Sequence, residues 1–247
     1  MHESMQGRIL LQRSMIKLLT IADLVTLLNA TLGFLAVLLV FSNEFQLAAS
    51  LILLGLLADG LDGIVARRLG NGKIGESLEP LADMISLSVA PLALFYKMYY
   101  DAVVGQPTVH LFLGGVLVFS LLCSLVRLSS FSLLKEKQFF IGLPTSASAM
   151  FLVLTSFLGL ELWIPLVVVI VLSVLMVSSV HFPKLGMKAD VITGVFIIAT
   201  ILLGSRYYNV APLLLLVALL VYIIGGPVYL SWKKRKIVTG TGDTHSS

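Results

Sequence analysis

The sequence predicts an all-α, polytopic membrane protein with about eight transmembrane helices. Of its 247 residues, 58% are hydrophobic and only 12% are charged, and the mean hydropathy is +1.01. A soluble domain of this length does not bury so much apolar surface. The hydrophobic residues also form runs, several of which reach the roughly 20 residues that a helix needs to cross the hydrocarbon core of a bilayer.

Eight apolar segments follow one another along the chain, separated by short polar loops. They cover about residues 22–42, 46–64, 78–99, 109–133, 142–160, 162–180, 190–204 and 211–231. The first segment follows a basic stretch and runs on through Asn29 and Gly33 without a small-residue cleavage site. We therefore expect a retained first helix and not a cleaved signal peptide.

The basic residues lie mostly on one side of this arrangement. With the N-terminus inside, 14 of the 17 Lys and Arg residues fall in cytoplasmic segments. The opposite loops SNEFQ, YYDAVVGQPTVH and ELW contain none, and GSRYYN contains only Arg206. The positive-inside rule thus predicts an even number of helices, with both termini and the basic loops on the cytoplasmic side of the cell membrane. Membrane topology explains the net charge of +4 without nucleic acid, since no interleaved aromatic residues form a base-stacking surface.

We expect one integral membrane catalytic domain over residues 1–236, because no polar linker interrupts the apolar segments. The remaining residues, 237–247, are small and polar and predict a disordered tail.

The single cysteine, Cys123, lies inside an apolar run. It excludes an intrachain disulfide and a cysteine-rich metal site.

Four acidic residues stand where apolar segments begin or end. Asp59 and Asp62 close the second segment, and Glu79 and Asp83 open the third. Spacings of three and four residues place each pair on one helix face, so the carboxylates of two antiparallel helices can converge at the cytoplasmic border. Oxygen ligands suit hard cations such as Mg²⁺, Mn²⁺ or Ca²⁺, bound as one ion or as two close together. Ordinary helix-end acids and a proton or cation path are the alternatives.

The segment between the two acidic pairs has the composition of a phosphate-binding loop. Gly63 and Ala66 leave room beside the acids for a bulky ligand, which a bare ion path does not need. Glycines let the following loop fold over a phosphate, and basic side chains complement a diphosphate. These residues are Gly70, Gly72 and Gly75, and Arg67, Arg68 and Lys73.

Residues 59–83, DGLDGIVARRLGNGKIGESLEPLAD, resemble the signature of the CDP-alcohol phosphotransferase family, DxxDGxxAR followed by GxxxDxxxD. Glu79 departs from it, because the family has Asp there. The resemblance implies a six-helix membrane core that binds CDP and two divalent ions, Mg²⁺ or Mn²⁺. It implies metal ligation by Asp59, Asp62, Glu79 and Asp83, with Asp83 also the catalytic base. The expected CDP-binding residues are Thr26, Asn29, Gly63, Ala66, Arg67, Lys73 and Gly75.

Four more stretches, LADMISLSVAP, RLSSF, IGLPTSASA and MVSSVHFPK, look like the phosphatidylserine synthase branch of this family. That resemblance implies transfer of a phosphatidyl or archaetidyl group from a CDP-linked lipid to L-serine, with release of CMP, by a homodimer. Arg127, in the fourth segment, is our candidate for binding the serine carboxylate. A snorkelling arginine at a helix end is the alternative.

Three other functional hypotheses stay open at the level of the sequence. Glycerol phosphate, inositol phosphate or an amino alcohol would be acceptors in the same chemistry. Intramembrane carboxylates also occur in transporters and ion channels. The presence of Glu79 in place of Asp is compatible with a catalytically degenerate homologue.

Overall fold

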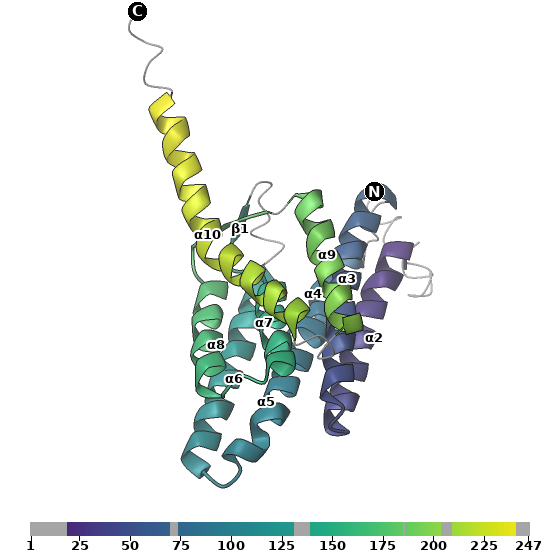
Figure 1. The fold of residues 1–247 in the computed structure, drawn as a ribbon. Coiled ribbons are helices and arrows are strands. Elements are labelled where there is room, and N and C mark those ends of the chain that lie inside the picture. The colour runs from purple at the N-terminus through teal and green to yellow at the C-terminus, as the bar shows by residue number, and fades with distance from the viewer. Residues whose placement is uncertain (1–18, 70–73, 131–138, 185, 204–208, 241–247) are drawn as a thin grey trace, which may run out of the picture.

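The computed structural model describes residues 19–69, 74–130, 139–184, 186–203 and 209–240. These residues form a bundle of helices with one small two-stranded sheet (Figure 1). In chain order the elements are α2 (Ile21–Phe41), α3 (Phe45–Leu69), α4 (Gly75–Asp83), the π-helix η2 (Met84–Val89), α5 (Ala90–Val103), α6 (Pro107–Ser130), β1 (Phe139–Ile141), α7 (Thr145–Leu158), α8 (Trp163–Met176), β2 (His181–Pro183), α9 (Met187–Leu203) and α10 (Val210–Gly240).

The described helices have the lengths and compositions of a polytopic membrane protein. Four stretches are long and apolar enough to cross a membrane, namely Ile21–Phe41, Gly75–Val103, Pro107–Ser130 and Val210–Leu230. Four shorter apolar helices are Phe45–Leu61, Thr145–Leu158, Trp163–Met176 and Ala189–Leu203. Each predicted apolar segment corresponds to one of these stretches, so the predicted fold class is confirmed.

A tight hairpin joins α2 and α3. The first helix begins with a capping box, in which the Thr20 amide donates to the Asp23 carboxylate at 2.7 Å and the Thr20 hydroxyl accepts from the Asp23 amide at 3.4 Å. Asn43, with φ of 62°, makes the left-handed turn that leads into α3. The two helices then run antiparallel, which brings the first half of α2 alongside the second half of α3, where Asp59 lies.

The elements α4, η2 and α5 form one continuous helical stretch interrupted by a π turn immediately after Asp83. A π turn contains more residues than an α turn, and such insertions are frequent at functional sites. Here η2 packs directly against α2. A Cβ added at Gly33 would lie 2.5 Å from the Cα of Ser86, so only glycine permits this approach of the two backbones.

Helix α7 lies at the centre of the bundle, and nearly all of its side chains are buried. Pro144 is its N-cap, with extended backbone angles, and Gly159 ends it with φ of 59°. The helix is therefore shorter than the predicted segment 142–160. Because other helices surround α7, it does not need the length of a lipid-exposed span.

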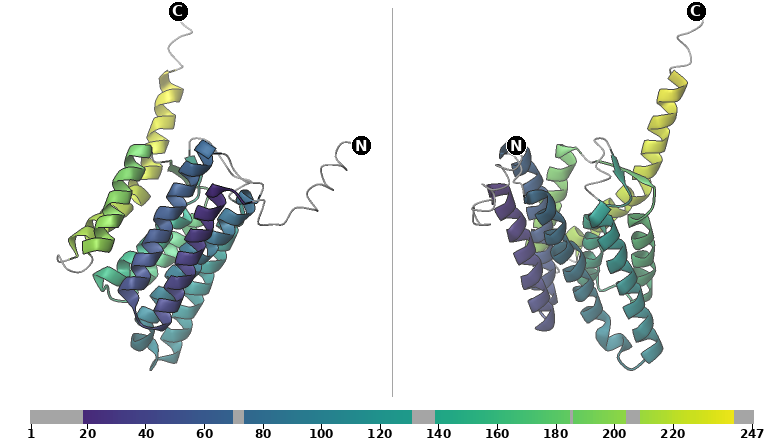
Figure 2. Two further views of the ribbon diagram at one scale, coloured as in Figure 1. Left: turned by 90° about the vertical axis from the view of Figure 1, so that its right-hand side faces the viewer. Right: turned by 180° about the vertical axis from the view of Figure 1, so that it is seen from behind.

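The two strands were not predicted from the sequence. β1 pairs antiparallel with β2, with Phe140 opposite Phe182, and each strand has only three residues. Helix α10 packs against β2, where the Tyr222 hydroxyl donates to the Pro183 carbonyl at 3.2 Å. It then extends beyond the bundle on the same side as the sheet (Figure 2). Because α10 continues to Gly240, the tail predicted to begin at 237 is helical in its first residues. Residues 241–247 lie outside the described part of the chain.

Candidate active site

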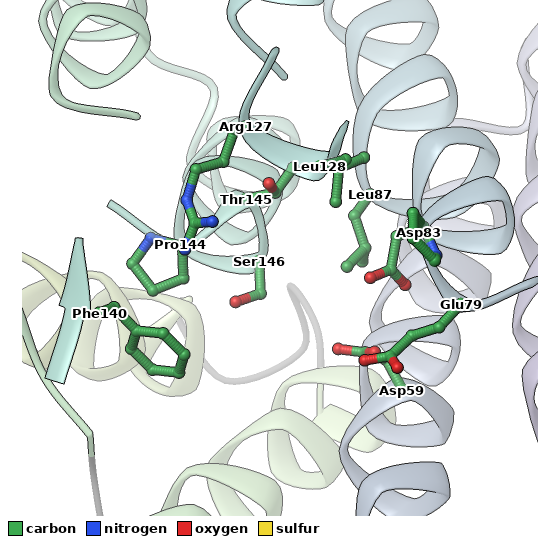
Figure 3. Close-up of a pocket in the computed structure, with 11 residues that line it drawn as sticks. Asp59, Glu79, Asp83, Leu87, Arg127, Leu128, Phe140, Pro144, Thr145 and Ser146 are labelled. Atoms are coloured by element: carbon green, nitrogen blue, oxygen red, sulfur yellow. The ribbon is translucent and has the colours of Figure 1, made fainter. Parts of the chain in front are cut away.

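A cavity lies where α3, α4, η2, α6, β1 and the start of α7 meet (Figure 3). One side is acidic, and the other carries an arginine and two hydroxyl groups. The lining residues are Asp59, Glu79, Pro80, Asp83, Leu87, Arg127, Leu128, Phe140, Pro144, Thr145 and Ser146. Residues separated by more than 80 positions in the sequence thus line one space.

Three of the four acids singled out by the sequence lie on the acidic side of this cavity. Asp59 comes from α3, while Glu79 and Asp83 are one turn apart on α4. Figure 3 shows all three carboxylates on the same side of the cavity. All three side chains are half-buried. The backbone of Asp62 belongs to α3, but its side chain lies outside the described part of the structure.

The donor chemistry of the acidic side fits a hard divalent cation. Asp59, Glu79 and Asp83 offer only carboxylate oxygens, and oxygen ligands of this kind are the ones that Mg²⁺ and Mn²⁺ prefer in proteins. Among the described residues, no group of three or more His, Cys, Asp or Glu side chains is arranged to hold a metal ion. Asp59, Glu79 and Asp83 therefore share one side of the cavity without being grouped to hold an ion by themselves. The side chain of Asp62, the fourth expected ligand, lies outside the described part of the structure.

The carboxylate of Asp83 is connected to α2. The side-chain amide of Asn29 donates a hydrogen bond of 3.0 Å to Asp83 Oδ1. Thr26, one turn earlier on α2, is buried and donates from its hydroxyl to the Ala22 carbonyl at 3.2 Å. Neither Thr26 nor Asn29 is among the residues that line the cavity. Their predicted contact with CDP therefore stays a prediction.

Across the cavity from the acids, Arg127 extends from the last turn of α6. Its side chain is only 7% exposed, and its Nε donates to the Leu143 carbonyl at 3.3 Å. Thr145 and Ser146, in the first turn of α7, line the same side. In Figure 3 the Ser146 hydroxyl points into the cavity. The cavity thus has an anionic and a cationic side.

Comparison with known proteins assigns the chain to a family. Residues 19–175, more than half of the chain, match the family described as CDP-alcohol phosphatidyltransferase. The chain belongs to the CDP-alcohol phosphatidyltransferase family. The matched region contains every described residue that lines the cavity.

Several proteins similar to this phosphatidyltransferase are named as enzymes that use serine. A CDP-diacylglycerol–serine O-phosphatidyltransferase from Methanocaldococcus jannaschii is 37% identical over 169 residues, which are 68% of this chain and 76% of the relative. An archaetidylserine synthase from Methanothermobacter thermautotrophicus is 36% identical over 180 residues, 70% of this chain and 73% of the relative. A CDP-diacylglycerol–serine O-phosphatidyltransferase from Bacillus subtilis is 32% identical over 165 residues, 65% and 88% of the two chains.

The family assignment establishes the class of reaction. The chain is an enzyme that transfers a phosphatidyl-type group from a CDP-linked lipid to an alcohol, and the family in general depends on divalent metal. This finding favours the transferase over the ion-path hypothesis. A diphosphate is also the kind of group whose charge is neutralised by divalent ions that carboxylates hold.

The predicted CDP-binding residues of the signature are only partly described. Gly63, Ala66 and Arg67 belong to α3, but their side-chain environments lie outside the described structure, and so does Lys73 as a whole. Gly75 is the first residue of α4. A Cβ added there would come within 2.7 Å of Asp23 Oδ1. The buried Asp23 side chain therefore explains why a glycine begins α4.

Several residues of this phosphatidyltransferase site were missed in the sequence analysis. Phe140, Thr145 and Ser146 line the cavity, although no site role was assigned to them. Thr145 and Ser146 belong to the stretch IGLPTSASA. Its resemblance to one branch of the family could have indicated that they lie at the site. Pro144 in this stretch is the N-cap of α7, so Thr145 and Ser146 stand in the first turn of the helix, where they line the cavity.

Proposed function

We propose that this enzyme transfers a phosphatidyl or archaetidyl group from a CDP-linked lipid to L-serine and releases CMP. The observation that carries the proposal is the presence of Arg127 and the acids Glu79 and Asp83 in one cavity. L-Serine combines a hydroxyl group, which reacts, with a carboxylate, which a guanidinium group binds. The names of the relatives from Methanocaldococcus jannaschii, Bacillus subtilis and Methanothermobacter thermautotrophicus support serine as the acceptor.

In the proposed reaction, the hydroxyl oxygen of serine attacks the lipid-side phosphorus of the diphosphate. A new phosphorus–oxygen bond forms to serine while the bond from the same phosphorus to the CMP oxygen breaks, so CMP leaves with the electron pair. The proton of the serine hydroxyl passes to the Asp83 carboxylate, which lines the cavity. No covalent enzyme intermediate is needed, because the acceptor attacks in line with the leaving group.

Asp59, Asp62, Glu79 and Asp83 would hold two divalent ions, Mg²⁺ or Mn²⁺. The metal would supply positive charge that neutralises the diphosphate and lowers the pKa of the acceptor hydroxyl. The carboxylates of Asp59, Glu79 and Asp83 line one side of the cavity, which supports this assignment. The longer side chain of Glu79 reaches further from its helix than an aspartate.

Arg127 is proposed to bind the carboxylate of serine. Its planar guanidinium group presents paired N–H donors that match a carboxylate. Thr145 and Ser146 add hydroxyl groups on the same side of the cavity. Since the acids lie opposite, the serine hydroxyl would point toward Asp83 while its carboxylate stays at Arg127. An amino alcohol is protonated at neutral pH and has no carboxylate, so it offers no anionic group to this cationic side.

The CDP moiety is proposed to lie at the end of α3 and the start of α4. Gly63, Ala66 and Gly75 would give it room, while Arg67 and Lys73 would complement the diphosphate.

We further propose that both termini and the cavity face the cytoplasm, as the distribution of basic residues indicates. The enzyme is also proposed to be a homodimer, as the family resemblance implies. Membrane lipid would surround the exposed apolar faces.

Release of CMP from CDP-diacylglycerol tests the proposal. Purified enzyme in detergent, supplied with Mn²⁺, is given L-serine, glycerol 3-phosphate, inositol phosphate or no acceptor. We expect release that depends on L-serine and that falls by at least about 100-fold in Asp83→Asn, which cannot accept the proton. Equal release with CDP-archaeol would show that the lipid chains are not discriminated. Release only with another acceptor would contradict the serine assignment, and no release with any acceptor would contradict the catalytic role.

A further inference from the structure

Asn29 is fully buried on α2, with 0% of the residue exposed, yet it contacts Asp83, one of the acids that line the cavity. Its Nδ2 donates to Asp83 Oδ1 at 3.0 Å, across 54 positions of sequence. A carboxylate only accepts hydrogen bonds, so the amide nitrogen must be the atom that faces Asp83. The orientation of the Asn29 amide is therefore fixed by chemistry.

The other end of the same amide is left unsatisfied. Asn29 Oδ1 is buried and has no hydrogen-bond partner among the residues that the structure describes. Such a buried carbonyl oxygen is destabilising, because it has lost its hydrogen bonds to water. An apolar side chain of the same shape would avoid this cost. The presence of asparagine here indicates that the bond to Asp83 has a purpose other than stability.

Close packing prevents the amide from turning away. A Cβ added at Gly55 would lie 2.9 Å from Asn29 Oδ1 and 3.7 Å from the Cβ of Ser86. Gly33, one turn after Asn29 on α2, lets the η2 backbone approach at Ser86. Because Gly33 and Gly55 have no side chains, α2, α3 and η2 pack closely around Asn29, next to the start of the π turn that follows Asp83.

We infer that Asn29 is a positioning residue for the general base Asp83 and that it does not contact the nucleotide. Its amide holds one carboxylate oxygen and so fixes the plane of the Asp83 carboxylate. The second oxygen then takes the proton of the acceptor hydroxyl. This inference rests on the proposed function, in which Asp83 is the base. Small errors in the placement of reacting groups lower the rate of chemistry more than they lower substrate affinity.

Asn29→Leu tests the inference, because leucine has nearly the same shape but cannot donate a hydrogen bond. We expect kcat for CMP release to fall about 10- to 100-fold, with KM for CDP-diacylglycerol within about twofold of wild type. The thermal midpoint in detergent should be unchanged or higher, since the unsatisfied Oδ1 is removed. The matched control is Thr31→Val, whose exposed hydroxyl donates to the Leu27 carbonyl of the same helix, α2, at 2.8 Å. It should leave kcat, KM and the thermal midpoint unchanged.

A higher KM for CDP-diacylglycerol with wild-type kcat would overturn the inference and identify Asn29 as a nucleotide contact. If Asn29→Leu does not fold, Gly55→Ala decides, because its Cβ pushes on Oδ1 without removing the amide. Wild-type kcat in Gly55→Ala, with a displaced amide, would also contradict the inference. Wild-type enzyme is assayed beside each variant with every acceptor. If it uses an acceptor other than serine, the acceptor proposal fails while the role of Asn29 is still tested with that acceptor.

Discussion

At the scale of single residues, Glu79 distinguishes this chain from the aspartate of the family signature. Glu79 lines the cavity beside Asp59 and Asp83, so its carboxylate occupies the expected place despite the additional methylene. The bundle can accept the longer side chain because Glu79 is only half-buried. Glu79 thus presents a carboxylate to the cavity, as an aspartate would, and metal binding through Glu79 stays a prediction.

Substitutions of Glu79 should separate the charge of its side chain from its length. Glu79→Gln removes the anionic ligand, and we expect CMP release to fall at least about 10- to 100-fold. Glu79→Asp should stay active and raise the ratio of activity with Mg²⁺ to activity with Mn²⁺, because Mg²⁺ demands near-ideal octahedral geometry. The measurement is CMP release over a concentration series of each metal. Wild-type rates in Glu79→Gln would remove Glu79 from the metal site, and a very large gain in Glu79→Asp would support a degenerate wild type.

Arg127 is the residue at which acceptor recognition can be tested. Arg127→Lys keeps the positive charge but loses the two-pronged geometry. We expect KM for L-serine to rise about 10-fold, with KM for CDP-diacylglycerol unchanged, in steady-state assays of CMP release. Lys97→Arg, on α5 near the ring of Tyr100, is the control for an exchange of one cationic side chain for another outside the cavity. An unchanged KM for serine in Arg127→Lys would place the carboxylate elsewhere.

At the scale of elements, the sequence predicted the long helices well and the interruptions poorly. Hydropathy predicts α2 and α6 because each helix is one apolar run between polar segments. The π turn η2 has no such signal, since MISLSV is an ordinary apolar helical sequence and the turn depends on packing against α2. The strands β1 and β2 could not be predicted either, because three residues are too few to show the alternation of apolar and polar residues that indicates a strand.

The contact between α2 and η2 gives a prediction at this scale. In Gly33→Ala, the added methyl group meets the backbone of Ser86, so η2 and the attached α4 must shift. We expect about 1–3 kcal/mol of destabilisation, seen as a lower thermal midpoint in detergent, together with lower kcat. Gly114→Ala is the matched control, because a Cβ at Gly114 of α6 meets nothing within 4 Å. A stable and fully active Gly33→Ala would show that Asp83 does not depend on this contact.

At the scale of the whole molecule, the site could be predicted only in part. The signature predicted the acidic side, because Asp59, Glu79 and Asp83 lie within 25 residues of each other on two consecutive helices. The opposite side depends on how α6 and α7 pack against them, which spacing along the chain does not reveal. Arg127 was found as an unusual charge in an apolar run, whereas Thr145 and Ser146 are common residues at a helix start.

The orientation of the bundle in the membrane is the last prediction. The α2–α3 turn lies at one end of the bundle and the sheet lies at the other (Figure 1). The basic segments predict that the sheet end is cytoplasmic. In a Cys123→Ser background, a cysteine at Ser42, exposed in the α2–α3 turn, should react with a membrane-impermeant maleimide added to intact cells. A cysteine at the exposed Gly186 should react only after the membrane is opened. The reverse pattern would place the cavity outside the cytoplasm and would contradict the proposed orientation.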